Sequence, residues 1–248
     1  RKLLGELREE MGEWVFSSQM MNEPVDSESA IFSPTLLEKM QWKGDKRQFI
    51  ERVPCQTFVA VDPAWGGNDF TGIIVGAMHE NSKLYILEAR RLRVKPDEML
   101  DHIIAIAQTW NAVKIGFEAV GGGQEWLMEH LRDRLDKADY QVPVIPVSHQ
   151  NKSKDVRVLG LVPLLSSRRL YIHESCDDLL QELGQFPRSS YRDLMDATEM
   201  LTRIATPPGR GKTLNPRRMP GTGEYELAMV EKLQAGKRKQ HGYRARWR

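Results

Sequence analysis

Four acidic residues have types and positions that could bind metal ions. Asp62 and Glu118 each end a short apolar run, and Asp193 and Asp196 lie three apart on one face of a helical pattern. Crowded carboxylates repel one another unless a cation lies between them, and hard oxygen ligands favour Mg²⁺ or Mn²⁺. One or two such ions, about 4 Å apart when paired, could activate water and stabilise the leaving oxygen in phosphodiester hydrolysis.

Each of these acids also has a simpler interpretation. Asp62 precedes a proline and could begin a turn, whereas Glu118 could pair with a Lys or Arg at the end of a buried strand. Asp193 and Asp196 could be solvated helix residues, and their spacing does not say which is the primary ligand. Asp69 follows in the loop after Asp62 and could bind a second ion through water, although Asp is also an ordinary turn residue.

The elements that must position these acids form an α/β domain. Three β-prone segments come first, at 57–61, 72–78 and 83–90, and the short turn before the third predicts a hairpin. Further strands are expected at 113–117, 142–147 and 170–172, alternating with helices around 96–107, 126–135, 156–165, 179–183 and 194–201. This order predicts a mixed central sheet, three antiparallel strands followed by parallel ones, with helices on both faces. If their strands are neighbours, Asp62 and Glu118 converge at one sheet edge.

Composition divides the 248 residues into three regions. Residues 1–55, with short helices expected at 3–15 and 34–40, hold too few apolar positions for their own core and are interpreted as a connector or arm. Residues 56–206 carry the dense periodic pattern of one domain. Residues 207–248 begin with a Pro-Pro-Gly break and contain eleven Lys and Arg against three acids, which predicts a flexible basic tail. Such a tail suggests a polyanionic partner, the alternative being a solubilising extension.

Several protein classes are excluded by composition. Two cysteines cannot build a disulfide framework or a four-cysteine zinc site. No apolar run approaches the roughly 20 residues that cross a bilayer, and no secretory leader is recognisable, so we expect a protein that is neither secreted nor membrane-bound. The sequence GRGKT at 209–213 lacks the first glycine of a phosphate-binding loop and a strand before it, so no ATPase motif is assigned.

Basic residues supply candidate nucleic-acid contacts. Lys152, Lys154 and Arg157 open the helix that follows the strand at 142–147, where they could hold phosphates or simply form a solvated helix face. The tail ends with three more candidates for DNA binding, which are Arg244, Arg246 and Arg248.

Four segments resemble a known protein family in sequence, order along the chain and spacing. The segment 57–75 (TFVAVDPAWGGNDFTGIIV) resembles the first strand, metal-binding Asp and second strand of the large terminase subunits of tailed bacteriophages. The segment 113–123 (VKIGFEAVGGG) resembles their second acidic motif, and 191–200 (YRDLMDATEM) their C-terminal Asp-x-x-Asp-Ala motif. The segment 12–24 (GEWVFSSQMMNEP) is similar to the junction that follows the ATPase domain of that family.

The resemblance implies a C-terminal RNase H-like nuclease domain whose Asp62, Glu118, Asp193 and Asp196 hold the metal ions. It implies an endodeoxyribonuclease that cuts concatemeric viral DNA during genome packaging in the host cytoplasm. Double-stranded DNA, the portal protein and the small terminase subunit would be its partners. The sequence departs from the family at Arg192, where a second adjacent acid is common, and in the missing ATPase domain.

Two other functions stay open at this stage. Similar Asp, Glu and paired-Asp arrangements occur in RuvC-like junction-resolving nucleases, which would prefer four-way junctions. A non-catalytic packaging module that binds DNA or the portal protein would bind without cutting.

Overall fold

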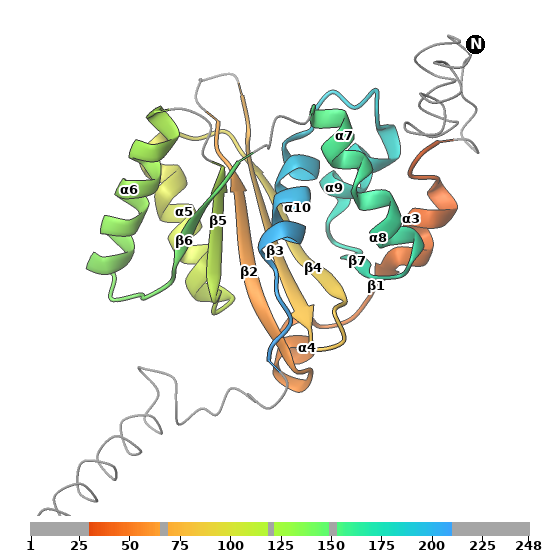
Figure 1. The fold of residues 1–248 in the computed structure, drawn as a ribbon, viewed down its shortest axis with the longest axis horizontal. Coiled ribbons are helices and arrows are strands. Elements are labelled where there is room, and N and C mark those ends of the chain that lie inside the picture. The colour runs from red at the N-terminus through yellow and green to blue at the C-terminus, as the bar shows by residue number, and fades with distance from the viewer. Residues whose placement is uncertain (1–29, 65–68, 119–121, 149–152, 210–248) are drawn as a thin grey trace, which may run out of the picture. The chain divides into compact units, whose positions relative to one another are not determined.

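A seven-stranded mixed sheet forms the centre of the part of the chain that the structure describes (Figure 1). This computed structural model describes residues 30–64, 69–118, 122–148 and 153–209. The strands are β1 (Gln41–Trp42), β2 (Cys55–Asp62), β3 (Thr71–His79), β4 (Leu84–Leu92), β5 (Lys114–Glu118), β6 (Val144–Val147) and β7 (Leu170–His173). The helices are α3 (Pro34–Met40), α4 (Lys46–Arg52), α5 (Pro96–Thr109), α6 (Gly122–Lys137), α7 (Lys154–Leu159), α8 (Leu161–Ser166), α9 (Asp177–Gln185) and α10 (Asp193–Ile204).

The strand order is β1-β7-β4-β3-β2-β5-β6. The strands β2, β3 and β4 form an antiparallel meander, and the pairs β2–β5, β5–β6 and β4–β7 are parallel. The predicted fold, three antiparallel strands followed by parallel ones, is therefore confirmed. The central position of β2 brings it against β5, which is the neighbour relation that the acidic site requires.

Two hydrophobic cores lie on opposite faces of the sheet. Alternation along β2 sends Phe58 and Ala60 to the face covered by α3 and α7–α10, and Val59 and Val61 to the face covered by α5 and α6. Figure 1 shows these two groups of helices on either side of the sheet. The helix α10 packs across β2 and β3, and it is therefore the helix that can bring side chains to the end of β2.

The segment before β2 packs into the same body as the sheet. Phe32, Leu37 and Met40 are buried in the core beside α9, and β1 extends the sheet by pairing with β7. The sequence predicted α3 but neither α4 nor β1. The segment 3–15 and the whole of the tail beyond residue 209 lie outside the described residues.

The predicted helix at 156–165 is instead two short helices, α7 and α8. The two helices are separated at Gly160, whose own backbone stays in the right-handed helical region. Pro163 fits the first turn of α8, where its missing N–H would have no intrahelical acceptor.

Among the described residues, no helix is long and apolar enough to cross a membrane.

Candidate metal centre

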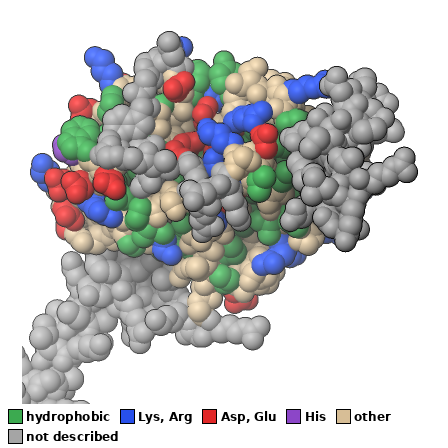
Figure 2. Space-filling model, turned by 45° about the horizontal axis from the view of Figure 1, so that its top comes forward, with side chains coloured by type: hydrophobic (Ala, Val, Ile, Leu, Met, Phe, Trp, Pro, Cys, Tyr) green, Lys and Arg blue, Asp and Glu red, His purple; other side chains and the backbone are tan. Residues whose placement is uncertain are grey.

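Asp62 and Glu118 are brought together by the parallel pairing of β2 and β5. Val61 pairs with Phe117, so the two acids are the next residues at the ends of neighbouring strands. Asp62 lies two residues after Ala60 on β2, and Glu118 lies two residues after Gly116 on β5, which pairs with Ala60. Because side chains alternate along a strand, both acids point to the face that α10 covers. Figure 2 is turned so that this end of the sheet comes toward the viewer, and it shows acidic side chains beside Lys and Arg side chains.

The two carboxyl groups are buried and hydrogen-bonded to each other. Asp62 is 8% exposed and Glu118 is 7% exposed, and a side-chain hydrogen bond joins them. Burial raises the pKa of Asp62 well above its ordinary value, and the hydrogen bond to Glu118 and the negative charges of Glu118 and Asp196 raise it further. The ionised form of Asp62 is therefore disfavoured unless a cation lies beside it.

Asp196 reaches the same place from the first turn of α10 and is fully buried. Its carboxylate contacts two basic groups of α7, Lys154 Nζ at 3.2 Å and Arg157 Nη2 at 3.1 Å. The side chain of Arg157 is only 3% exposed, whereas that of Lys154 is 57% exposed. Burial alone would lower the pKa of Lys154, but the charges of Asp196, Asp62 and Glu118 raise it above its ordinary value.

Asp193 begins α10 and is half-buried. Burial raises its pKa, and the charges of Lys154 and Arg91 oppose that rise. Its neighbour Arg192, where the resemblance favoured an acid, pairs with Asp155 of α7 and donates to the carbonyl of Pro187. The departure from the family pattern thus ties the start of α10 to α7.

Glu182 of α9 is a buried acid that the sequence did not single out. It is 2% exposed, its Oε1 accepts a hydrogen bond from Arg91 Nη2 at 2.6 Å, and its Oε2 accepts one from the backbone N–H of Met195 at 3.1 Å. The N-cap residue of α10 offers no side-chain acceptor, so Glu182 satisfies one of the N–H groups that a helix leaves open. The available signal was an acid next to the apolar positions of α9.

The remaining predicted residues are less informative. Asp69 is exposed in the loop before β3. Lys152, Arg244, Arg246 and Arg248 lie outside the described residues. Among the described residues, the predicted side chains that meet at the site come from β2, β5, α7 and α10.

The donor set suits a hard divalent cation, because it consists of buried carboxylates that repel one another. In the described part of the chain, however, no three His, Cys, Asp or Glu side chains are grouped closely enough to hold a metal ion as they stand. The carboxylate of Asp196 is paired instead with Lys154 and Arg157. The residues fit such an ion in chemistry, and Asp196 would have to exchange a contact to join Asp62 and Glu118 around it.

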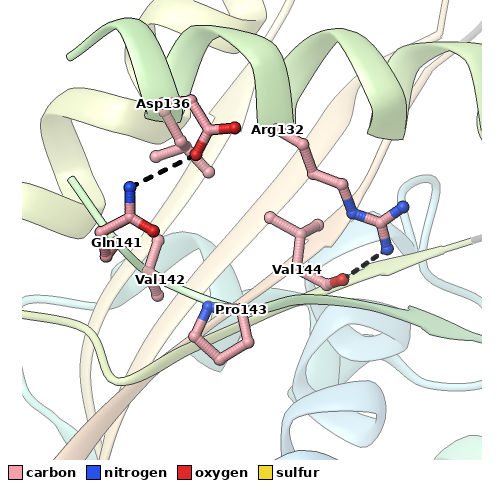
Figure 3. Close-up of a pocket in the computed structure, with 7 residues that line it drawn as sticks. Arg132, Asp136, Gln141, Val142, Pro143 and Val144 are labelled. Atoms are coloured by element: carbon pink, nitrogen blue, oxygen red, sulfur yellow. Dashed lines mark hydrogen bonds between the residues drawn. The ribbon is translucent and has the colours of Figure 1, made fainter. Parts of the chain in front are cut away.

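A surface pocket of about 440 Å³ lies elsewhere, between the end of α6 and the edge strand β6 (Figure 3). Arg132 spans it and donates from Nη2 to the carbonyl of Val144 at 2.7 Å. Since none of the four predicted acids lines this pocket, it is not part of the candidate metal centre.

The fold and the acidic strand ends define an RNase H-like domain. Residues 59–203 match the family described as Terminase RNaseH-like domain, and the chain belongs to this family. No curated protein sequence matches the chain.

Three viral structures share the fold. The human cytomegalovirus terminase nuclease domain is 11% identical, with a TM-score of 0.54 over 71% of this chain and 96% of that one. The P22 large terminase nuclease domain is 16% identical, with a TM-score of 0.52 over 71% and 93%. The HK97 bacteriophage large terminase is 12% identical, with a TM-score of 0.53 over 71% of this chain but only 43% of that longer one.

Proposed function

We propose that this chain is the nuclease domain of a large terminase subunit, a metal-dependent endonuclease that cuts concatemeric viral DNA during genome packaging. The observation that carries the proposal is the buried, hydrogen-bonded pair of Asp62 and Glu118 at the ends of adjacent strands, with Asp196 beside it. Membership of the Terminase RNaseH-like family supports it. The cytomegalovirus relative was studied after soaking with Mn, which agrees with a divalent-ion requirement.

In this proposal Asp62, Glu118, Asp196 and Asp193 hold one or two Mg²⁺ or Mn²⁺ ions. The ions would supply an activated water and stabilise the charge that develops on the leaving 3′ oxygen. Asp62 would act as an ionised ligand, and its burial would keep competing water away. The backbone at Gly72 and the carboxylate of Glu182 hold the start of α10, and thereby Asp193 and Asp196, against the two strand ends.

The two basic partners of Asp196 have different roles in this proposal. Arg157 is buried, and it keeps the carboxylate of Asp196 oriented throughout. Lys154 is more than half exposed, so it can release Asp196 to a metal ion and turn toward a phosphate of the substrate. Lys154 would thus pair with Asp196 in the free protein and contact a phosphate when DNA is bound.

The wider assembly follows from the same proposal. The chain would act in the host cytoplasm beside an ATPase domain, with residues 1–55 as the connection to it and 207–248 as a basic tail. Double-stranded DNA is the substrate, and the portal protein and the small terminase subunit are the proposed protein partners. Arg244, Arg246 and Arg248 are proposed to contact DNA through its phosphates.

The test is cleavage of supercoiled plasmid and of synthetic four-way junctions with Mn²⁺, using the wild type, Asp62→Asn and Asp133→Asn. Asp133 is an exposed acid of α6 and controls for the loss of one charge. We expect plasmid nicking by the wild type and by Asp133→Asn, and none by Asp62→Asn. Preference for junctions would identify a resolvase, and DNA binding without cutting would identify a non-catalytic packaging module.

A further inference from the structure

A cluster of aromatic and basic side chains lies on the same sheet edge as the acidic pair. We call it the Tyr191 patch, and it consists of Phe70, Arg91, Arg93 and Tyr191. Arg91 of β4 pairs with Gly72 of β3, which in turn pairs with Asp62 of β2. Neighbouring strands are about 4.8 Å apart, so Arg91 begins roughly 10 Å from Asp62 along this edge.

The patch is held together by ring and guanidinium contacts. The rings of Phe70 and Tyr191 meet edge to face with their centroids 5.2 Å apart. The guanidinium of Arg91 lies 4.4 Å from the centroid of the Tyr191 ring, and that of Arg93 lies 5.8 Å from the centroid of Phe70. These contacts orient the two rings and the two arginines at one place on the surface.

Part of this surface stays open to solvent. The ion pair between Arg91 and Glu182 is already largely buried, and Tyr191 covers it with one side of its ring. Tyr191 nevertheless remains 45% exposed, and Arg93 is exposed as well. An exposed aromatic ring with a neighbouring guanidinium is the combination that binds nucleic-acid strands, because rings stack on bases and sugars while arginine binds phosphate.

We propose that the Tyr191 patch binds the substrate DNA strand to one side of the scissile phosphate. This rests on the proposed function, because it places that phosphate at Asp62 and Glu118. A separation of roughly 10 Å corresponds to about three nucleotides at 3.4 Å per nucleotide. Arg93 contacts a backbone phosphate there, and Tyr191 stacks on a sugar or on an unpaired base. Neither contact reads sequence, so the patch adds affinity without sequence preference.

The phosphate contact is tested by the salt dependence of binding. The whole chain is titrated, without divalent ions so that no cutting occurs, into a labelled duplex of roughly 30 base pairs at several salt concentrations. For Arg93→Ala we expect weaker binding and a slope of log K against log salt that is smaller by about 0.9. Lys137→Ala, which removes one exposed charge from the far end of α6, should bind with the slope of the wild type. An unchanged slope in Arg93→Ala would overturn the phosphate contact.

The stacking contact is tested with a single-stranded DNA of the same length. Tyr191→Ala should bind it about tenfold more weakly, and Tyr191→Phe should bind it as the wild type does, since stacking on one base contributes about 1–3 kcal/mol. Thermal unfolding of both variants shows whether α10 has been disturbed. Equal binding by a stable Tyr191→Ala protein would overturn the role of the ring.

Nicking assays separate this inference from the proposed function. With Mn²⁺, Arg93→Ala should show a KM for DNA raised several-fold and an unchanged kcat. If the wild type cuts DNA and both patch variants keep the wild-type KM and the wild-type salt dependence of binding, the patch inference fails while the proposed function stands. If the wild type never cuts but the patch variants still lose DNA affinity, the proposed function fails and the patch remains a DNA-binding surface.

Discussion

The backbone of Asp193 lies directly on Gly72, so that a Cβ atom added at residue 72 would stand 2.4 Å from the carbonyl oxygen of Asp193. Gly72 pairs with Asp62 on one side and with Arg91 on the other. The missing side chain therefore makes the space through which α10 approaches the sheet between the acidic pair and the Arg91–Glu182 ion pair.

Gly72→Ala should displace the start of α10, because the obstructing atoms belong to backbone. We expect a loss of about 2–3 kcal/mol in the free energy of unfolding, near the upper end for overpacking, and weaker Mn²⁺ binding. Gly76→Ala is the matched control, since its Cβ would meet the movable end of Leu201 at 2.6 Å and lies further along β3. For both variants, urea unfolding measures the free energy of unfolding and calorimetric titration measures the Mn²⁺ affinity. Normal Mn²⁺ affinity in Gly72→Ala would contradict the positioning of Asp193 and Asp196 by this contact.

Glu182→Ala should destabilise the protein by about 3 kcal/mol, because it leaves Arg91 without its carboxylate and the Met195 N–H without its acceptor. Glu182→Gln keeps an acceptor of the same shape and should cost less than half as much. Urea unfolding gives both values. If the two variants were equally destabilised, the hydrogen bond from Met195 N–H to Glu182 would contribute little to stability compared with the ion pair to Arg91.

Asp62→Asn should stabilise the metal-free protein at neutral pH. The folded state raises the pKa of Asp62, first through burial and then through Glu118 and Asp196. The stability linked to this group is therefore fully present below the ordinary carboxyl pKa of about 4 and is lost as pH rises through the raised value. The variant should have the higher Tm at pH 7 in chelator, with a smaller difference near pH 4.

Addition of Mn²⁺ should reverse this order at pH 7. The ion stabilises the wild type by binding its folded state, whereas the amide of Asp62→Asn offers no charge to the ion. Thermal unfolding with and without Mn²⁺ measures the reversal. A wild type whose Tm is unaffected by Mn²⁺ would argue against a metal site at Asp62.

Arg157→Ala and Lys154→Ala should differ strongly in stability, although both contact Asp196. Removal of buried Arg157 leaves the buried carboxylate of Asp196 with one partner, and we expect a loss of about 3 kcal/mol. Lys154 is more than half exposed, so its removal should cost less than about 1 kcal/mol. Chemical denaturation of the two variants at pH 7 makes the comparison. Similar losses would mean that burial of the guanidinium does not determine how Asp196 is held.

Local sequence pattern was enough to predict most elements and the acids at their ends. Apolar periodicity is a local property, and it was sufficient to predict β2 ending at Asp62, β5 ending at Glu118 and α10 carrying Asp193 and Asp196. It failed for β1, which has only two residues, and for α4, which buries none of its residues and so shows no apolar face. It also missed the break at Gly160, because both halves of the segment are helical and the glycine itself keeps a helical backbone.

Which of these groups come into contact depends on packing between elements that are distant in the sequence. The pairing of β2 with β5, the burial of Arg157 against Asp196 and the cap of α10 by Glu182 each join residues from different elements. The charge pattern of a single segment does not reveal such partners, because an acid or base on a helix is equally compatible with solvent until packing removes the water around it. The same packing makes Lys154 and Arg157 partners of Asp196, where the sequence alone suggested a phosphate contact or an exposed helix face.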